Sequence, residues 1–233
     1  LYLLASVALV VSVMRLASKK VLVHDMKCIE TLARVNVLCV DKTGTITENT
    51  MEVNGEIPMD GYDSQSMAPL KQIISDFASA MSSDNITMKA MKDYFNKPSG
   101  RKAVSVSPFS SQFKYSGAAF EDGSYVLGAP EFVLREDYDN YREQIEQYSS
   151  EGYRVLVFGI YDGVIDGKAL TGKVTPLGLV FLSNPIRKEA PETFKYFENQ
   201  GVEIKVISGD NPLTVSQLAQ NSGRLSKVLP LLT

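Results

Sequence analysis

The chain has 233 residues, of which 44% are hydrophobic and 22% charged, and its formal net charge is −3 at pH 7. This is the composition of an ordinary globular protein, long enough for one large domain or two small ones, and its charge gives no sign of a nucleic-acid partner. A single histidine, His24, excludes histidine-based catalysis and a multi-histidine metal site. The two cysteines lack metal-like spacing, so we expect reduced thiols in a cytosolic setting, with Cys39 in a core strand.

The first predicted element is an apolar helix over residues 1–17. Its uncharged run ends at Arg15, and Lys19 and Lys20 follow. The run is shorter than the roughly 20 residues that span a bilayer. We interpret it as the inner end of a transmembrane helix, with the basic residues on the cytoplasmic side. A buried core helix is the alternative.

A phosphoryl-binding turn is predicted next. A connector with a short helix is expected over residues 18–34, and a buried strand over residues 35–40 leads directly to Asp41. The turn Lys-Thr-Gly-Thr-Ile-Thr occupies residues 42–47. Because α/β sheets place their chemistry at the carboxyl ends of strands, Asp41 is positioned as a nucleophile. The Lys42 ammonium, the threonine hydroxyls and the backbone N–H groups of the turn can hold a phosphoryl group.

The middle of the chain, residues 53–172, has the pattern of an inserted α+β region. Apolar spacing and short runs between turn residues predict helices that pack on an antiparallel sheet. The predicted helices cover residues 64–81, 85–95 and 137–150, and the predicted strands cover residues 101–109, 115–121, 125–127, 153–162 and 168–170.

The last part of the chain returns to an α/β pattern. We expect it to continue the parallel sheet that residues 18–52 begin. The predicted elements are a strand over residues 173–182, a helix over 188–200, a strand over 202–208 and a helix over 211–221.

Five short motifs accompany these elements. Three lie in the insert, and they begin at Phe109, Gly128 and Gly152 (Phe-Ser-Ser-Gln-Phe-Lys, Gly-Ala-Pro-Glu and Gly-Tyr-Arg-Val-Leu). Two follow the insert, Asn-Pro-Ile-Arg from residue 184 and Ser-Gly-Asp-Asn from residue 208. Each residue taken singly has an ordinary structural explanation, such as a core phenylalanine or a solvated surface charge.

The seven residues 41–47 closely resemble the phosphorylation signature of P-type ATPases, the cation pumps that carry energy as an aspartyl phosphate. The insert motifs are similar to the nucleotide-domain motifs of these pumps in order and approximate spacing. The two motifs after the insert, which begin at Asn184 and Ser208, resemble the Asp-Pro-x-Arg hinge and the Thr-Gly-Asp-Asn loop of the same pumps. The resemblance implies an α/β fold in which a haloacid-dehalogenase-like parallel sheet, an incomplete phosphorylation domain, is interrupted by an α+β nucleotide-binding domain with an antiparallel sheet. The implied divisions are 1–17 for the end of a transmembrane helix, 18–52 and 173–233 for the phosphorylation domain, and 53–172 for the nucleotide-binding domain.

The resemblance also implies a mechanism for the turn. Asp41 attacks the γ-phosphorus of ATP, and Mg2+ is bound by the Asp41 carboxylate and the backbone carbonyl of Thr43. Soluble phosphatases of the same superfamily usually have a second aspartate at the position of Thr43. A threonine cannot serve as that acid and base, so a long-lived acyl phosphate is expected, which favours a pump over a phosphatase.

For the nucleotide, the resemblance implies that Phe109 stacks on adenine and that Lys114 reaches the adenine or the α-phosphate. Gly128 belongs to the same site, and Arg154 contacts a phosphate. Arg187 pairs either with a nucleotide phosphate or with an aspartate of the last motif.

The last motif completes the implied site. Ser208 grips a phosphoryl oxygen, Gly209 allows close approach of the backbone, and Asp210 orients the ribose or the hinge. Asn184 stands where the hinge usually has aspartate, and we interpret it as a turn residue.

Some expected features depart from the pattern. Leu127 stands where the family usually has lysine, and Met88 where it often has glutamate, so ATP is expected to bind weakly or the base to be read less strictly. A second magnesium-binding loop, its preceding lysine and the actuator domain are not among these residues. We therefore expect the chain to be a fragment, about a quarter to a third of a pump.

Residues 21–33 resemble the E-type cation-transporting ATPases of Gram-positive bacteria, near the calcium pumps. The implied partners are ATP, a transported cation for which calcium is the first choice, and the membrane, through transmembrane helices of the parent protein. The implied location is the cell membrane, with residues from about 18 onward in the cytoplasm. A truncated ATP-binding module that does not transport is one alternative, and a soluble phosphatase is the other.

Overall fold

The computed structural model describes residues 2–25, 27–208 and 227–230. Its helices are α1 (Tyr2–Ser18), α2 (Lys27–Leu32), α3 (Leu70–Ala80), α4 (Ile86–Tyr94), α5 (Pro130–Leu134), α6 (Tyr138–Ser150) and α7 (Ala190–Asn199). Its strands are β1 (Val37–Asp41), β2 (Glu52–Pro58), β3 (Ser105–Ser107), β4 (Tyr115–Phe120), β5 (Gly123–Gly128), β6 (Arg154–Tyr161), β7 (Val174–Ser183), β8 (Glu203–Ser208) and β9 (Lys227–Pro230). Two short helical turns are η1 (Lys42–Ile46) and η2 (Arg135–Asp137).

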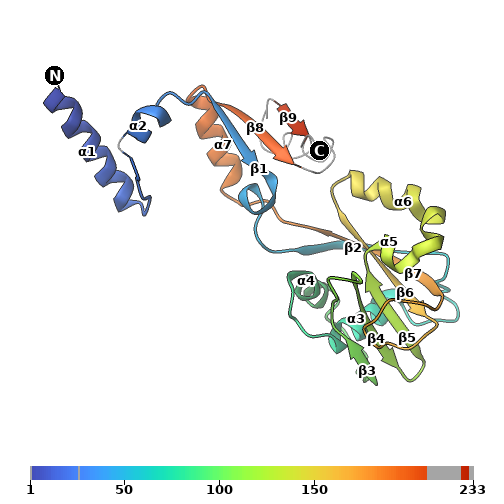
Figure 1. Ribbon diagram of the computed structural model, residues 1–233. Helices are drawn as coiled ribbons and strands as arrows, with labels where there is room; N and C mark the ends of the chain where they lie inside the picture. The colour runs from blue at the N-terminus through green and yellow to red at the C-terminus, as the bar shows by residue number, and fades with distance from the viewer. Residues whose placement is uncertain (1, 26, 209–226, 231–233) are drawn as a thin grey trace.

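Two sheets of different type divide the strands between them (Figure 1). Three parallel strands follow the order β1-β8-β9, and six strands follow the order β2-β7-β6-β5-β4-β3 with antiparallel pairing. The predicted fold class, a parallel sheet interrupted by an α+β region with an antiparallel sheet, is confirmed. Figure 1 shows two chain segments joining the sheets, one that enters β2 and one that leaves β7.

The parallel sheet brings the ends of β1 and β8 together. Asp41 is paired in register with Ile207, so Asp41 and Ser208 lie at the same edge of the sheet. In β8, Ile204 and Val206 are buried whereas the residues between them are partly exposed, which is the alternation of a strand with one covered face. Helix α7 supplies that cover. The buried members of the shared cluster are Ile46, Ala190, Phe194, Ile204 and Val206.

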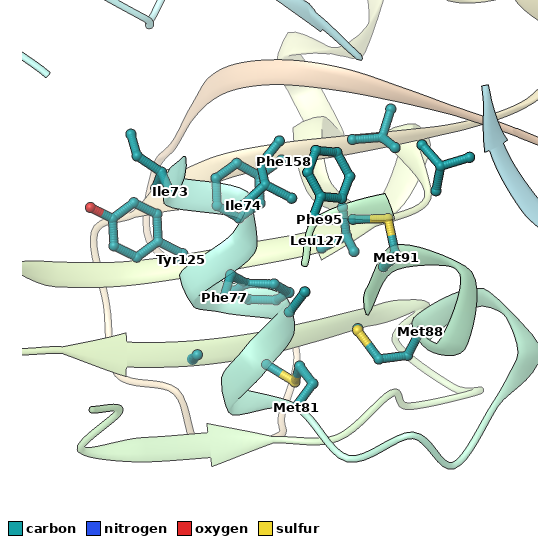
Figure 2. Packing of buried hydrophobic residues seen from close by; sticks show 14 of the residues in the cluster. Ile73, Ile74, Phe77, Met81, Met88, Met91, Phe95, Tyr125, Leu127 and Phe158 are labelled. Carbon is teal, nitrogen blue, oxygen red and sulfur yellow. The ribbon is translucent and has the colours of Figure 1, made fainter. Parts of the chain in front are cut away.

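Helices cover both faces of the antiparallel sheet. Successive residues of a strand point to opposite faces, and in β5 Leu127 packs with α3 and α4 whereas Val126 packs with α5 and α6. Phe77 of α3 makes an edge contact with Phe158 of β6, with ring centroids 5.3 Å apart (Figure 2). Tyr125 stacks on the same Phe158 ring at 5.7 Å. This region therefore has a hydrophobic core on each side of its sheet.

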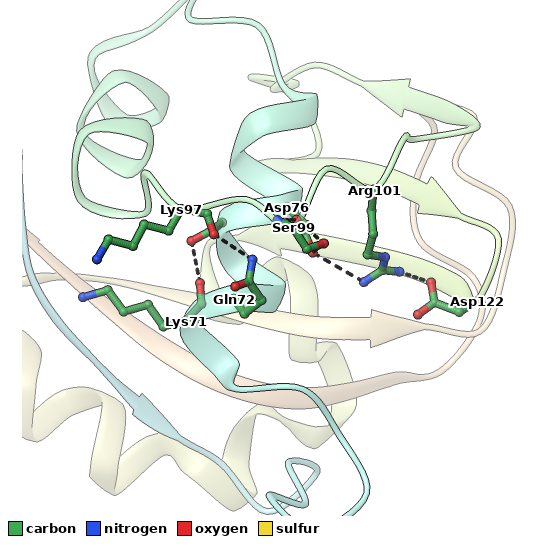
Figure 3. A network of polar contacts seen from close by, with 8 residues as sticks. Lys71, Gln72, Asp76, Lys97, Ser99, Arg101 and Asp122 are labelled. Atoms are coloured by element: carbon green, nitrogen blue, oxygen red, sulfur yellow. Dashed lines mark hydrogen bonds and ion pairs between the residues drawn. The ribbon is translucent and has the colours of Figure 1, made fainter.

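A buried carboxylate fixes the segment that leads into β3 (Figure 3). Asp76 of α3 is only 2% exposed, and it accepts hydrogen bonds from the Ser99 backbone N–H at 2.6 Å and from the Ser99 hydroxyl at 2.8 Å. Arg101 lies 3.9 Å from Asp76 and also pairs with Asp122 of the β4–β5 hairpin. These contacts tie α3, the segment and the hairpin together ahead of Phe109.

One predicted strand is in the wrong sheet. The strand predicted over residues 173–182 forms β7, which pairs antiparallel with β2 and β6 and is not part of the parallel sheet. Its residues are buried on both faces, because helices cover both sides of this sheet, and such a continuous apolar run is typical of parallel strands. The prediction also missed β2, the partner of β7. We therefore place the border of the insert after Ser183.

Other predictions need smaller corrections. The strand predicted over residues 168–170 is irregular, because the Tyr115 hydroxyl donates to the Lys168 carbonyl at 2.6 Å and the Arg135 guanidinium donates to the Leu170 carbonyl. Cys39 is exposed, since among the described residues β1 is not covered on the face that carries it. The helix predicted over residues 211–221 lies outside the described residues.

The apolar first segment forms α1, as the sequence predicts. Leu3 and Leu4 are exposed, and the helix lies beside α2 at one end of the molecule (Figure 1). Within the described ranges, no helix combines the length and the apolar character needed to cross a membrane.

Candidate functional site

The turn after β1 is closed on itself by a buried threonine. The Thr47 side chain is 1% exposed, and its backbone N–H donates to the Lys42 carbonyl at 3.1 Å. The Thr47 hydroxyl oxygen accepts from the Gly44 N–H at 3.2 Å. Gly44 has φ of +75°, a left-handed conformation that glycine adopts without strain. The turn therefore has a defined shape, and Asp41 is exposed at its start.

Arg187 holds this turn from the other chain segment. Its Nε donates to the Thr45 carbonyl at 3.0 Å, and its Nη2 donates to the Gly44 carbonyl at 3.1 Å. Its backbone N–H donates to the Ile46 carbonyl at 2.9 Å. The sequence pointed to a nucleotide phosphate or an aspartate as the partner of Arg187, whereas these contacts show Arg187 bound to the turn after β1. The nucleotide-binding role of Arg187 stays a prediction.

Three predicted residues lie in or beyond the end of β8. Ser208 is the last residue of β8, beside the end of β1, and its side chain is not part of the description. Gly209 and Asp210 lie outside the described residues. Their roles stay predictions.

The loop between β3 and β4 presents an aromatic ring and a cation. Ser110 organises it: the Ser110 hydroxyl accepts from the Phe113 N–H at 3.2 Å, and the Ser110 carbonyl accepts from the Lys114 N–H at 2.7 Å. Phe109 is 49% exposed, so one face of its ring is available for stacking. Lys114 is exposed and has φ of +55°, an uncommon value for a residue with a Cβ.

Gly128 explains how Lys114 is held in place. A Cβ at Gly128 would lie 2.4 Å from the Lys114 carbonyl oxygen and 2.7 Å from the Tyr115 Cβ, so a side chain does not fit. The next residue, Ala129, donates its N–H to the same Lys114 carbonyl at 3.0 Å. The position therefore serves close packing of β5 against the Lys114 loop.

One cleft of about 1130 Å3 joins the turn after β1 to the antiparallel region. The predicted residues that line it are Lys42, Thr43, Phe109, Lys114, Gly128 and Arg154. Asp41 and Arg187 are not among its lining residues, although Asp41 directly precedes Lys42 and Arg187 binds the Gly44 and Thr45 carbonyls. Three glutamates also line the cleft, so its charge is mixed. An aromatic ring, two lysines and an arginine along one cleft suit an elongated anion with a flat apolar end.

The oxygen donors at the turn fit a magnesium ion. Mg2+ prefers oxygen ligands and keeps several water or phosphate ligands, so one exposed carboxylate and one carbonyl from Asp41 and Thr43 would suffice on the protein side. Across the described ranges, no group of three or more His, Cys, Asp or Glu side chains is arranged to hold a metal ion.

The sequence interpretation missed several polar residues in the cleft, and Asn85 and Ser116 are among them. Ser116 could have been found, because it lies in a predicted strand and is the cross-strand partner of Leu127, and such partners share a face of the sheet. Asn85 could not, because its place in the cleft depends on how α4 packs against the sheet.

Comparisons with known proteins identify the family of this chain. A model of the family described as hydrolase, haloacid dehalogenase-like hydrolase, matches residues 35–230. The chain belongs to this family. The chain is also similar to the calcium-transporting ATPase CtpE of Mycolicibacterium smegmatis, with 38% identity over 224 residues, and to the probable cation-transporting ATPase exp7 of Streptococcus pneumoniae, with 37% identity over 225 residues. The match covers 96% and 95% of this chain but only 27% and 28% of the two relatives.

A solved structure extends the likeness to the fold. A crystal structure of a zinc-transporting PIB-type ATPase in its E2.Pi state matches with a TM-score of 0.60 and 19% identity, over 89% of this chain and 31% of that one. At this identity the likeness concerns the fold alone. The resemblance to P-type cation-transporting ATPases, predicted from residues 41–47, is confirmed by these relatives within the haloacid dehalogenase-like hydrolase family.

Proposed function

We propose that this chain is the ATP-binding and phosphoryl-accepting part of an ATP-driven cation pump. One observation supports this most strongly: a single cleft joins Lys42 and Thr43 of the turn to Phe109, Lys114 and Arg154 of the antiparallel region. A nucleotide bound along that cleft would have its base at Phe109 and its phosphates directed toward the turn.

The reaction proposed is phosphoryl transfer to Asp41. A carboxylate oxygen of Asp41 forms a bond to the γ-phosphorus, the bond from that phosphorus to the bridging oxygen breaks, and ADP leaves. Lys42 and the turn N–H groups stabilise the charge on the transferred group. Magnesium, when bound, would neutralise phosphate charge at the oxygens of Asp41 and Thr43. Thr43 supplies no second carboxylate to activate water.

A phosphoenzyme assay tests the proposal. Incubation of the full-length gene product with labelled ATP and Mg2+ should give an acid-stable, hydroxylamine-sensitive phosphoprotein. The Asp41→Asn variant should give no label, because an amide does not attack phosphorus. Label that persists in Asp41→Asn would show that the nucleophile is elsewhere.

Two alternatives predict different results in the same assay. A non-transporting ATP-binding module would bind ATP without forming a phosphoprotein. A soluble phosphatase would release phosphate from small phosphate esters, a reaction that Thr43 disfavours. Calcium is the cation we propose, since the relatives at 38% identity bear the name calcium-transporting ATPase. A cell-membrane location for the parent protein, with residues from about 18 onward in the cytoplasm, belongs to the same proposal.

A further inference from the structure

A second, smaller hollow adjoins the cleft at Phe109. It has a volume of about 230 Å3, and four residues line both it and the main cleft. These four are Asn85, Met88, Phe109 and Ser116. They mark the place where a flat ring stacked on Phe109 would meet the protein along its edge.

Ser116 presents a hydroxyl at this junction. The residue is only 3% exposed, and it is the cross-strand partner of Leu127, whose side chain is also buried. Among the described residues no hydrogen bond involves the Ser116 hydroxyl, and no fully buried side-chain polar atom lacks a partner. The hydroxyl is therefore in contact with the hollow, where it has neither a protein partner nor bulk solvent around it. A polar group in this position has its hydrogen bond available for a ligand.

Asn85 presents a donor on the opposite element. It is the N-cap of α4, and its side-chain oxygen accepts from the Met88 N–H at 2.8 Å. Since that bond occupies the oxygen, the side-chain NH2 group remains to donate, and Asn85 lines both hollows. Met88 lines both hollows and Leu127 lines the main cleft, and both side chains supply only apolar surface. The resemblance had led us to look for glutamate and lysine at these positions.

We propose that Asn85 and Ser116 contact the edge of the nucleotide base, and that this pocket accepts both adenine and guanine nucleoside triphosphates. The inference rests on the proposed function. A serine hydroxyl rotates to accept from an amino group or to donate to a carbonyl, and the Asn85 NH2 donates to a ring nitrogen or to a carbonyl. Adenine and guanine can each form a hydrogen bond with the Ser116 hydroxyl and with the Asn85 NH2 group. One charged residue, Asp84, also lines the smaller hollow, and its carboxylate accepts a hydrogen bond from the Ser82 hydroxyl. Since the two groups assigned to the ring edge, Asn85 and Ser116, are both uncharged, the pocket separates the two bases poorly.

NMR titration of the 233-residue chain with ATP and with GTP tests this, because the method measures weak binding. Wild type should bind the two with dissociation constants within about threefold of each other. Asn85→Asp keeps the N-cap acceptor but replaces the donor by a carboxylate. When both bases present the edge that carries the group at ring position 6, the carboxylate accepts from the adenine amino group and repels the guanine carbonyl. It should shift the ratio of the two constants toward ATP by about tenfold. Ser83→Asp, an exposed position that lines neither hollow, controls for the added charge and should leave the ratio unchanged.

Ser116→Ala is the second variant. Since no protein group bonds to the Ser116 hydroxyl, the melting temperature should stay the same while both nucleotides bind about threefold to tenfold more weakly. If neither nucleotide binds wild type, the proposed function fails and the inference fails with it. If both bind but Asn85→Asp leaves the ratio unchanged, or wild type already prefers ATP by more than about thirtyfold, only the base-edge assignment is overturned.

Discussion

The antiparallel region and the parallel sheet are packed very differently. The antiparallel sheet has a hydrophobic cluster on each face, whereas the described part of the parallel sheet has one cluster of five buried residues under α7. The end of the cleft at Phe109 is thus built on a region with its own core. The other end is a short turn whose shape depends on Thr47 and on Arg187.

The segments between the two regions are held by polar contacts. The Glu48 N–H donates to the Pro185 carbonyl at 2.8 Å, and the Asn184 side chain donates to the Thr50 carbonyl at 2.6 Å. These bonds keep the outgoing and returning chains paired between the sheets. If the proposed function is correct, nucleotide binding depends on a packed core, whereas phosphoryl transfer depends on a small number of hydrogen bonds at the turn.

Core substitution should have the largest effect and should separate the regions. Phe77→Ala removes a fully buried ring, so we predict a loss of about 3–5 kcal/mol in the unfolding free energy of the antiparallel region. Phe194→Ala removes a ring from the α7 cluster and should leave the unfolding of the antiparallel region unchanged. Chemical denaturation followed by NMR signals from each region measures both. Simultaneous loss of both sets of signals in Phe194→Ala would show that the two regions unfold as one unit.

Loss of the buried carboxylate should come next. Asp76→Ala leaves the Ser99 N–H without its acceptor and removes one partner of Arg101, so we predict a cost of about 3 kcal/mol to the antiparallel region. Asp122→Ala is the matched control, because this carboxylate is exposed and its loss should cost less than about 1 kcal/mol. Equal costs for the two variants would mean that Asp76 acts only as a surface ion pair.

A change at Arg187 should act on the turn and not on binding. Lysine cannot donate to the Gly44 and Thr45 carbonyls with the fixed geometry of a guanidinium. We predict that Arg187→Lys lowers the rate of Asp41 phosphorylation about tenfold, the equivalent of one lost hydrogen bond, with the dissociation constant of ATP unchanged. Lys188→Ala, an exposed neighbour, is the control. A weaker ATP affinity in Arg187→Lys would instead support the contact with a phosphate that the sequence suggested.

The sequence predicted the elements whose signal is local. Asp41 at the end of a strand, the Asn85–Phe95 helix and the β4–β5 hairpin all depend on short-range patterns, and each is present. The assignment of β7 failed because a central strand with two covered faces has the same apolar run in either kind of sheet. Strand β2 was missed because its residues do not alternate regularly between apolar and polar. Its strand conformation is stabilised by pairing with β7.

The residues of the candidate site also divide into those with a local sequence signal and those without one. Motif residues such as Lys42, Phe109 and Arg154 were found from the sequence, and the structure places them on one cleft. Their roles in chemistry stay predictions. The contacts of Arg187 with the turn could not be predicted, because they depend on how two segments about 140 residues apart pair in space, as the hydrogen bonds to Gly44 and Thr45 record. The same holds for Asn85, whose position follows from the packing of α4.

Alkaline pH should give the smallest effect, and it should act on one region. Burial, with a smaller contribution from the nearby Asp166 and Tyr161, raises the pKa of Tyr115 above its ordinary value of 10.0, and burial likewise raises the pKa of Tyr125. The neutral phenol is therefore favoured in the folded state. Below pH 10.0 both states are protonated and stability is intact, whereas above it the unfolded chain loses these protons first, so the unfolding free energy falls as pH rises. Both tyrosines lie in the antiparallel region, whereas Tyr196 on α7 is 61% exposed.

Urea unfolding of the antiparallel region below and above pH 10.0 measures this loss. Tyr115→Phe keeps the buried ring without an ionisable group, so its stability should fall less steeply with pH than that of wild type, although its hydrogen bond to the Lys168 carbonyl is lost at every pH. Tyr196→Phe changes an exposed side chain on α7, outside the antiparallel region, so it is the control and should keep the wild-type slope. An unchanged slope in Tyr115→Phe would show that Tyr115 ionises as readily when folded as when unfolded. A steeper loss from the parallel sheet than from the antiparallel region would contradict the assignment of the alkaline sensitivity to the buried tyrosines.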